Sequence, residues 1–428
     1  MVKKSVNVND KYQKLILAIG PGILMAGAAI GVSHLVQATR AGAEYGFSLL
    51  WLLILAVVSK YPFMEFGPRY ASATGETLIK GYRHLGNYAY GTYIALTIGT
   101  MFIIQAAVTV VTAGLAEQLF NFGWSAVQWS GVILALCIVL LYIGHYKLLD
   151  LTMKFIISLL TICTVLAVIM ALGARVGSES VNAIPPSYWN RAGITFAIAF
   201  MGWMPIPLDA AVWHSIWTGE RAKQTHYLPT LKEANIDFNL GYLSAGFIGL
   251  LFFLLGALVM FGSGESFSNN SVQFSVQVIQ LYSNTLGAWS TPIIAIAALI
   301  TMFSTTLAVT DAYPRVMATL WAEHHPNPEK DQSNSIIYRV SLLVIPALAL
   351  IILQFLAGQT FTVLIDFASA LSFIAAPILG WFNLKLITGK STPAIARPNK
   401  FYRYFSWLCL LWLIAFTLIW FYWQFFYR

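Results

Sequence analysis

Polar side chains interrupt two of the long apolar runs of this sequence. In the first run they are Ser33 and His34, and in the second they are Met204 and Asp209. An imidazole, a thioether and a carboxylate are donor types that suit a transition metal, and an imidazole can also carry a proton. Because polar groups at membrane depth are costly unless they are paired, these residues are candidates for a binding site.

Two other interpretations of these residues remain open. His34 could be a packing histidine that a backbone carbonyl satisfies. Asp209 could merely cap the N-terminus of a helix, where a negative charge is favoured.

A helix break accompanies each polar pair. Gly31 stands at the first, and the second contains Pro205 and Pro207, each of which removes a backbone donor and restricts the residue before it. Unwound backbone at this depth is tolerated where it is buried in protein or lines a cavity. Two such breaks five spans apart predict an internal repeat with a binding site where the two halves meet.

Three more titratable groups are candidates for coupling or gating. His214 follows the second break, Asp311 stands four residues before Arg315 and shares a helix face with it, and Asp366 is a lone carboxylate in an apolar run. His214 could relay protons or merely pack between helices.

Lys60, Glu65 and Arg69 lie toward one end of an apolar run. Snorkelling of the long side chains, or pairing among them, explains these charges without a functional role.

The composition indicates an integral membrane protein. Of 428 residues, 58% are hydrophobic and 10% are charged, and no polar stretch is long enough for a soluble domain. We therefore expect one transmembrane domain over residues 1–428, without a cleaved signal peptide. Three cysteines lie inside apolar runs without metal-ligand spacing, which predicts buried free thiols: Cys137, Cys163 and Cys409.

About eleven spans follow from the length that a helix needs to cross a bilayer. Their approximate limits are 14–43, 47–67, 89–119, 127–145, 151–174, 193–218, 238–262, 288–320, 336–356, 361–387 and 405–426. Residues 14–174 would form the first five-span repeat, residues 193–387 the second, and residues 405–426 an additional helix.

The distribution of Lys and Arg predicts a cytoplasmic N-terminus. Residues 120–126, 262–287 and 357–360, which are predicted to be outer loops, contain no Lys or Arg. Arg175 and Arg191 flank the outer loop after the fifth span. The basic residues of the inner segments are Lys3, Lys4, Lys11, Arg69, Lys80, Arg83, Lys147, Arg221, Lys223, Lys232, Lys330, Lys385, Lys390, Arg397, Lys400 and Arg403. The net charge of +8 thus reflects topology, and no nucleic-acid partner is needed to explain it.

Several segments resemble the Nramp family of proton-coupled divalent metal transporters. They are GPGILM at 20–25, AGA at 41–43 followed by LLW at 49–51, the pair Met204-Pro205, and STT at 304–306. The resemblance covers spans one to ten in order. It implies a LeuT-type fold, an all-α five-plus-five inverted repeat with unwound helices one and six.

The metal site of that family is kept only in part. Its span-one motif, Asp-Pro-Gly-Asn, places the aspartate on Gly31 and the asparagine on His34. In span six the methionine of Met-Pro-His is Met204, the histidine position is Ile206, and the carbonyl ligand would belong to Met201.

The family's proton route is also changed. Its span-three acids fall on Gln105 and Val108, and its second span-six histidine falls on Ala211, or on His214 if three residues are inserted.

Three hypotheses follow. The first is a secondary transporter of a divalent metal, which would be the substrate, through a rebuilt site of His34, Met204 and Asp209, lined also by Gly31, Ser33 and Met201. The second is a transporter of the same architecture for a non-metal solute, held by half-helix ends with Trp203 and Trp213. The third is a non-transporting membrane sensor or partner protein.

No nucleotide-binding loop or catalytic motif favours an enzyme, and no cofactor is expected. The expected partners are membrane lipid and a transported ion or small solute. The compact chain, with no organellar leader, favours a bacterial inner membrane.

Overall fold

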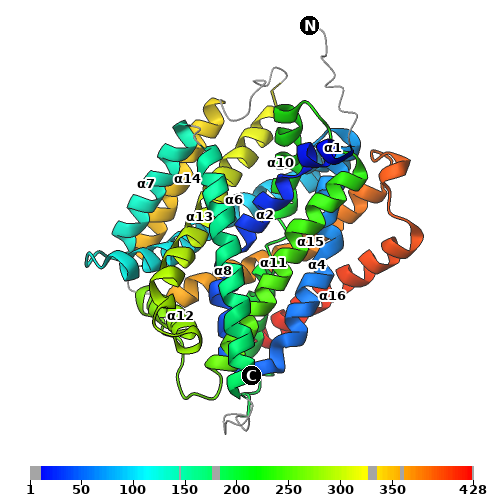
Figure 1. Cartoon of the computed structure of the whole chain (residues 1–428). Helices are drawn as coiled ribbons and strands as arrows, with labels where there is room; N and C mark the ends of the chain where they lie inside the picture. Colours follow the sequence, from blue (N-terminus) through cyan, green and yellow to red (C-terminus); the bar gives the residue numbers. More distant parts are fainter. Residues whose placement is uncertain (1–10, 144–145, 176–183, 326–334, 357–360, 427–428) are drawn as a thin grey trace.

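The computed structural model of this chain describes residues 11–143, 146–175, 184–325, 335–356 and 361–426 (Figure 1). These residues form helices and connecting segments, with no β-strand among them. The basic residues Lys3, Lys4 and Lys330 lie outside these ranges, and nothing is described for the side chains of Lys147 and Arg175.

The first half of the described chain contains ten helices. They are α1 (Lys11–Ala18), α2 (Pro21–Ala29), the π-helix η1 (Ser33–Ala38), α3 (Thr39–Tyr45), the 3₁₀ turn η2 (Gly46–Leu49), α4 (Leu50–Thr74), α5 (Leu78–Leu85), α6 (Asn87–Phe120), α7 (Ala126–Ile143) and α8 (Tyr146–Arg175).

The remaining described residues form a second series of helices. They are α9 (Arg191–Trp203), α10 (Ala210–Thr225), α11 (Leu231–Val259), α12 (Ser271–Leu286), α13 (Ser290–Ala322), α14 (Ile336–Phe355), α15 (Phe361–Thr388), the short turn η5 (Ala394–Ala396) and α16 (Lys400–Phe425).

Each of the eleven predicted spans coincides with a helix or a broken helix. Within the described ranges, eight helices are long and apolar enough to cross a membrane, or nine if α1 and α2, bent by 44°, form one span. The other two predicted spans are α8 and the broken pair of α9 and α10. The segment expected to be an outer loop contains α12, which is too short to cross a membrane.

The helix α4 continues well beyond the end predicted for span two. It runs through Pro62 and Pro68 to Thr74, where Gly75 ends it in a left-handed conformation. The apolar run predicts an end near residue 67, but the helix continues past both prolines. As a result, Lys60 lies near the middle of α4, not near its end.

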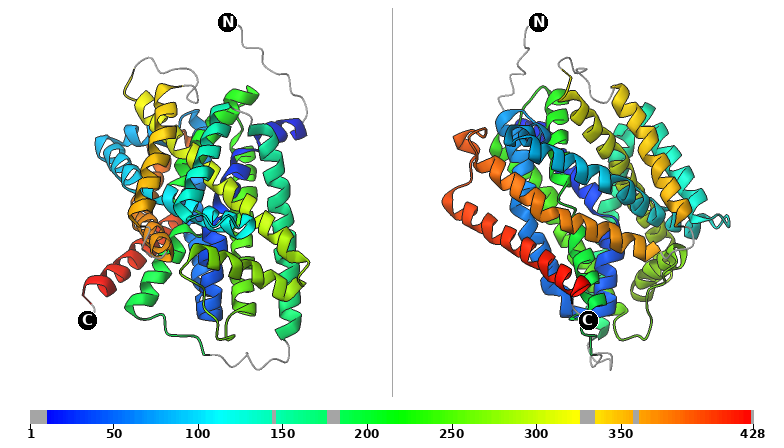
Figure 2. Two further views of the ribbon diagram at one scale, coloured as in Figure 1. Left: turned by 90° about the vertical axis from the view of Figure 1, so that its left-hand side faces the viewer. Right: turned by 180° about the vertical axis from the view of Figure 1, so that it is seen from behind.

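The two broken helices occupy the centre of the molecule. The helix α11 packs beside both halves of span one, α2 on one side of the break and η1 with α3 on the other, while α15 packs along α9 (Figures 1 and 2). Small residues permit this closeness: a Cβ on Gly22 would lie 2.0 Å from the Asp237 carbonyl oxygen, and one on Gly241 would lie 2.0 Å from the Gly22 oxygen.

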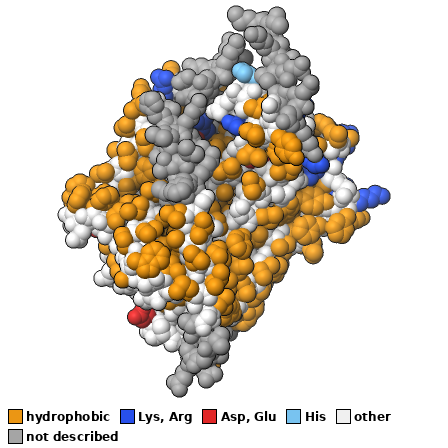
Figure 3. All heavy atoms as spheres, in the orientation of Figure 1, with side chains coloured by type: hydrophobic (Ala, Val, Ile, Leu, Met, Phe, Trp, Pro, Cys, Tyr) orange, Lys and Arg blue, Asp and Glu red, His pale blue; other side chains and the backbone are white. Residues whose placement is uncertain are grey.

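The two ends of the molecule differ in charge. On the face shown in Figure 3, Lys and Arg side chains gather at the end that carries the N-terminus, acidic atoms appear at the opposite end, and apolar side chains cover the surface between them. This distribution is the one that the predicted inner basic segments require. We call these ends the α1 end and the α12 end, after the helices that lie there in Figure 1.

Candidate functional site

The break in span one lies between α2 and η1. After Ala29 the backbone leaves the helix at Ile30. The Thr305 hydroxyl of α13 lies 3.0 Å from the Gly27 carbonyl oxygen and 3.1 Å from that of Ile30. A Cβ on Gly31 would stand 2.5 Å from the Thr305 Oγ1 atom. The position that the resemblance assigns to a metal-binding carboxylate therefore has no side chain, and Thr305 fills its space.

His34 is fully buried and engaged at both ring nitrogens. Its Nε2 atom lies 2.8 Å from the carbonyl oxygen of Ala245 on α11, and its Nδ1 atom lies 2.7 Å from the Ser33 Oγ atom. Because a carbonyl only accepts, Nε2 carries a proton, while the Ser33 hydroxyl also lies 2.7 Å from the Ala29 carbonyl oxygen, to which it donates. Neither nitrogen is free to bind a metal in this arrangement, which matches the packing role considered above.

The break in span six brings Met204 close to His34. A Cβ on Gly249 of α11 would lie 2.7 Å from the Met204 Sδ atom and 3.5 Å from His34 Nε2, so both groups lie against the same helix. Asp209 stands at the N-cap of α10 and accepts a hydrogen bond from Tyr313 at 3.4 Å.

Asp209 lines a separate small cavity. That cavity, of about 10 Å³, is formed with residues that include Tyr93, Thr100 and Ser372.

The cavity where the two breaks meet is small and mostly apolar. Its volume is about 30 Å³ and it is lined by Ala28, Ala29, Val32, Ser33, Ile104, Val108, Trp203, Ile206, Pro207, Trp213, Thr305 and Val309. None of His34, Met204 and Asp209 belongs to this lining. The buried Trp213 Nε1 donor has no hydrogen-bond partner among the described groups.

Lys60 approaches the span-six break from α4. Its side chain is fully buried, and its Nζ atom donates to the carbonyl oxygens of Gly202 at 2.7 Å and Ile206 at 3.2 Å. The snorkelling interpretation is therefore wrong for Lys60, because α4 extends further than expected and places this residue at membrane depth. Pairing holds for Glu65 and Arg69, whose closest atoms are 2.7 Å apart.

Asp366 joins α15 to the second half of span one. It accepts from Arg40 Nη1 at 2.8 Å and from Gln37 Nε2 at 2.9 Å. Arg40 also pairs with Glu44 at 3.3 Å and lies over the Phe196 ring. This cluster connects α3, α9 and α15 on the α12 side of the break.

Asp237 of α11 holds the first half of span one on the other side of the break. Its carboxylate accepts from the backbone N–H groups of Gly20 at 2.9 Å and Gly22 at 2.6 Å. The His214 Nε2 atom lies 3.6 Å from the Asp237 carboxylate, and neither His214 nitrogen has a hydrogen-bond partner in the described structure. A negative charge at a helix N-terminus is favourable, so Asp237 stabilises this contact.

The remaining predicted site residues lie outside the cavity at the breaks. Met201 is buried in the last turn of α9. Asp311 pairs with Arg315 at 2.6 Å, as predicted, and accepts from Tyr338 at 2.6 Å. Gln105 is buried and donates to Thr310 at 3.1 Å.

The three cysteines are buried and free, as expected. Within the described ranges, no three or more His, Cys, Asp or Glu side chains form a group that could hold a metal.

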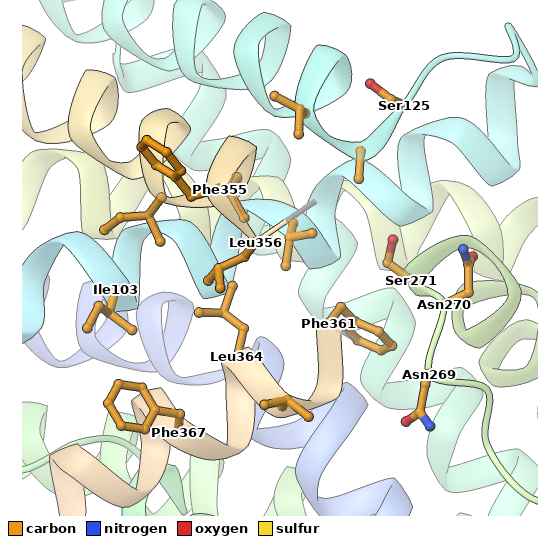
Figure 4. A pocket seen from close by; sticks show the side chains of 16 residues that line it. Ile103, Ser125, Asn269, Asn270, Ser271, Phe355, Leu356, Phe361, Leu364 and Phe367 are labelled. Atoms are coloured by element: carbon orange, nitrogen blue, oxygen red, sulfur yellow. The ribbon is translucent and has the colours of Figure 1, made fainter. Parts of the chain in front are cut away.

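A larger cavity lies away from the breaks. It has a volume of about 600 Å³ and is lined mainly by apolar residues of α6, α14 and α15, with Ser125, Asn269 and Asn270 at one edge (Figure 4). Its lining includes none of the residues proposed above for binding or coupling.

Sequence reasoning missed three residues that hold the broken span one: Thr305, Asp237 and Arg40, the partner of Asp366. Each is a charged or hydroxyl residue within an apolar run, and this pattern could have marked them as candidates. The partners come from helices distant in the sequence, so the signal did not reveal what each residue binds.

An all-helical membrane protein with two broken helices crossing its centre is the class that this architecture defines. The chain is structurally similar to a manganese transporter of Eremococcus coleocola, with a TM-score of 0.69 and 15% identity over 96% of this chain and 87% of that one. It is also similar to the transporter MhsT solved with L-phenylalanine, with a TM-score of 0.62 and 14% identity over 96% and 98% of the two chains. These similarities show a LeuT-type fold.

Residues 22–423 match the family model "Nramp: Natural resistance-associated macrophage protein-like", and the chain belongs to this family. It is 34% identical to an uncharacterised protein of Pasteurella multocida over 86% of this chain and 84% of that protein. It is 23% identical to the divalent metal cation transporter MntH of Staphylococcus aureus, over 81% and 77% of the two chains. The protein is thus a multi-pass membrane protein of a transporter family.

Proposed function

We propose that this protein is a secondary transporter of a bacterial inner membrane that carries a small non-metal solute through the cavity at the two breaks. The observation that carries the proposal is the position of the Thr305 side chain. Its hydroxyl bonds the span-one carbonyls and fills the space beside Gly31, where a metal-binding relative would place a carboxylate. Without an anionic oxygen in the cavity lining, a divalent metal lacks its strongest electrostatic attraction.

The chemistry of the cavity favours a solute with a hydrogen-bond acceptor. Trp203 and Trp213 supply aromatic walls, and the Trp213 Nε1 donor is buried without a partner among the described groups. An unsatisfied buried donor is costly, so a solute oxygen or nitrogen that accepts from it gains binding energy. The cavity of about 30 Å³ holds little more than a water molecule, so solute entry requires the helices to separate.

Alternating access would use the two contacts that hold span one. Release of the Arg40–Asp366 pair frees η1 and α3 at the α12 end, and release of Asp237 frees α2 at the α1 end. Asp366 is then a gating residue, in agreement with its role as a candidate gate.

Isothermal titration of the purified protein with Mn²⁺ tests the exclusion of metal, with the Staphylococcus aureus transporter as the positive control. We expect no saturable heat from this protein. Saturable binding that is lost in the Asp209→Ala variant would instead support the metal hypothesis.

Thermal unfolding with small organic solutes, in the presence of a metal chelator, tests whether the protein binds a non-metal solute. We expect a stabilising solute whose effect is lost in Trp213→Phe, because this variant keeps an aromatic ring but removes the donor. If the solute protects Trp213→Phe equally well, the proposed contact is wrong.

A further inference from the structure

Lys60 is a buried amine whose hydrogen-bond partners among the described residues are backbone oxygens. Its Nζ atom donates to Gly202 and Ile206, and its side chain is fully buried. In the part of the chain that the structure describes, no carboxylate lies within ion-pair distance of this amine.

The carbonyls that bind Lys60 lie where a free cation would be attracted. Gly202 is in the last turn of α9, and Ile206 is in the unwound segment between α9 and α10. Carbonyls at the C-terminal end of a helix have no partner further along the helix and carry partial negative charge. Half-helix ends and unwound carbonyls of this kind coordinate ions in transporters with broken helices.

The equivalent acceptors of span one are also satisfied from within the chain. Thr305 lies within hydrogen-bond distance of the Gly27 and Ile30 carbonyl oxygens. At both breaks, therefore, side chains from neighbouring helices take up the backbone oxygens that an ion would need.

We propose that Lys60 is a tethered cation that takes the place of a free inorganic cation at the span-six break, so that the site needs no bound metal or alkali ion there. This inference rests on the proposed function, in which the transported solute is not itself a metal ion. It goes beyond the proposed function because it gives Lys60 of α4 a specific role, in which its ammonium group stands in for a bound ion.

The test removes the ammonium and supplies it again in free form. Lys60→Ala deletes three methylene groups and the amine, which together correspond to propylammonium. We expect the melting temperature of Lys60→Ala to fall below that of the parent and to rise saturably with propylammonium chloride at constant ionic strength. 1-Propanol, which has similar size and no charge, should not restore it.

Two controls accompany this titration. The parent protein and Lys80→Ala, which removes a half-exposed amine paired with Glu76, should show no response to propylammonium. If Lys60→Ala is folded and propylammonium does nothing, or if 1-propanol works equally well, the proposal is overturned.

Lys60→Met decides the case in which Lys60→Ala cannot be purified. Methionine has similar length and no charge, and replacing a buried charge by an apolar side chain is often neutral or stabilising. We expect Lys60→Met to melt at a lower temperature than the parent because its carbonyl partners lose their donor. Equal or higher stability would show that the ammonium is not required.

The outcomes separate this inference from the proposed function. Saturable Mn²⁺ binding by the parent would overturn the proposed function and, with it, the premise of the inference. A parent that binds no Mn²⁺, together with a Lys60→Ala variant that ignores propylammonium, would overturn the inference alone.

Discussion

Individual residues, more than the fold, carry the proposal of a non-metal solute. At Gly31 the absence of a Cβ leaves room that the Thr305 hydroxyl takes, and at Gly202 the carbonyl accepts from Lys60. Lys60 offers only donors, and the Thr305 hydroxyl directs its single proton toward the backbone, so neither residue supplies the anionic oxygen that a divalent cation prefers.

The close contact at Gly31 predicts a stability effect. Gly31→Ala should lower the free energy of unfolding by about 1–3 kcal/mol, because the new methyl group overlaps Thr305 in a packed interior. Thermal or denaturant unfolding of the purified variant in detergent measures this change.

Gly27→Ala is the matched control for this prediction. A Cβ there would lie 3.5 Å from the Ser304 Oγ atom, which is ordinary contact, and alanine favours the helix by about 0.5–1 kcal/mol relative to glycine. Equal stability of the two variants would contradict the proposed filling of the Gly31 site by Thr305.

At the scale of elements, the broken span one is held at both of its halves. Arg40 and Asp366 connect α3 to α15, while Asp237 on α11 binds the first N–H groups of α2. The two contacts lie on opposite sides of the break, so the proposed alternating access would release each of them in a different step.

Loosening one contact should expose the cavity from one side. In a Val32→Cys background, we expect Asp366→Asn to accelerate alkylation of the new thiol about tenfold, because weakening a buried charged contact by about 1.4 kcal/mol shifts an equilibrium tenfold. Val32 lines the cavity and is 2% exposed, so the unmodified rate should be low. The rate is followed by mass spectrometry.

Asp311→Asn serves as the comparison, since it breaks a pair within α13 at 2.6 Å. The protein without Val32→Cys reports any reaction of the three buried native thiols. An unchanged rate in Asp366→Asn, or an equal rise in Asp311→Asn, would argue against a gate at Asp366.

For the whole molecule, charge asymmetry and helix count together predict orientation. Basic side chains gather at the α1 end, and the two termini lie at opposite ends of the molecule (Figures 1 and 3). With the positive-inside rule, the α1 end faces the cytoplasm.

Fusion reporters test this orientation in bacterial cells. A green fluorescent protein fused to the N-terminus should fluoresce, and an alkaline phosphatase fused to the C-terminus should be active outside the cytoplasm. Active phosphatase at the N-terminus would reverse the assignment.

The sequence alone determined where the helices lie and which of them break. Apolar length specifies a span because every backbone polar group must be satisfied inside the bilayer, and Pro205 and Pro207 mark one break because they remove donors. The pairing of Asp311 with Arg315 was also predictable, since residues four apart on a helix are neighbours.

Tertiary structure alone decided what the polar residues bind. The apolar length of span two places Lys60 toward the inner end of a helix that stops near residue 67, but α4 continues to Thr74, and the amine donates to the carbonyl of Gly202. His34 binds Ala245, and Thr305 fills the space at Gly31. These contacts join residues far apart in the chain, and only the packing of helices against one another sets such distances.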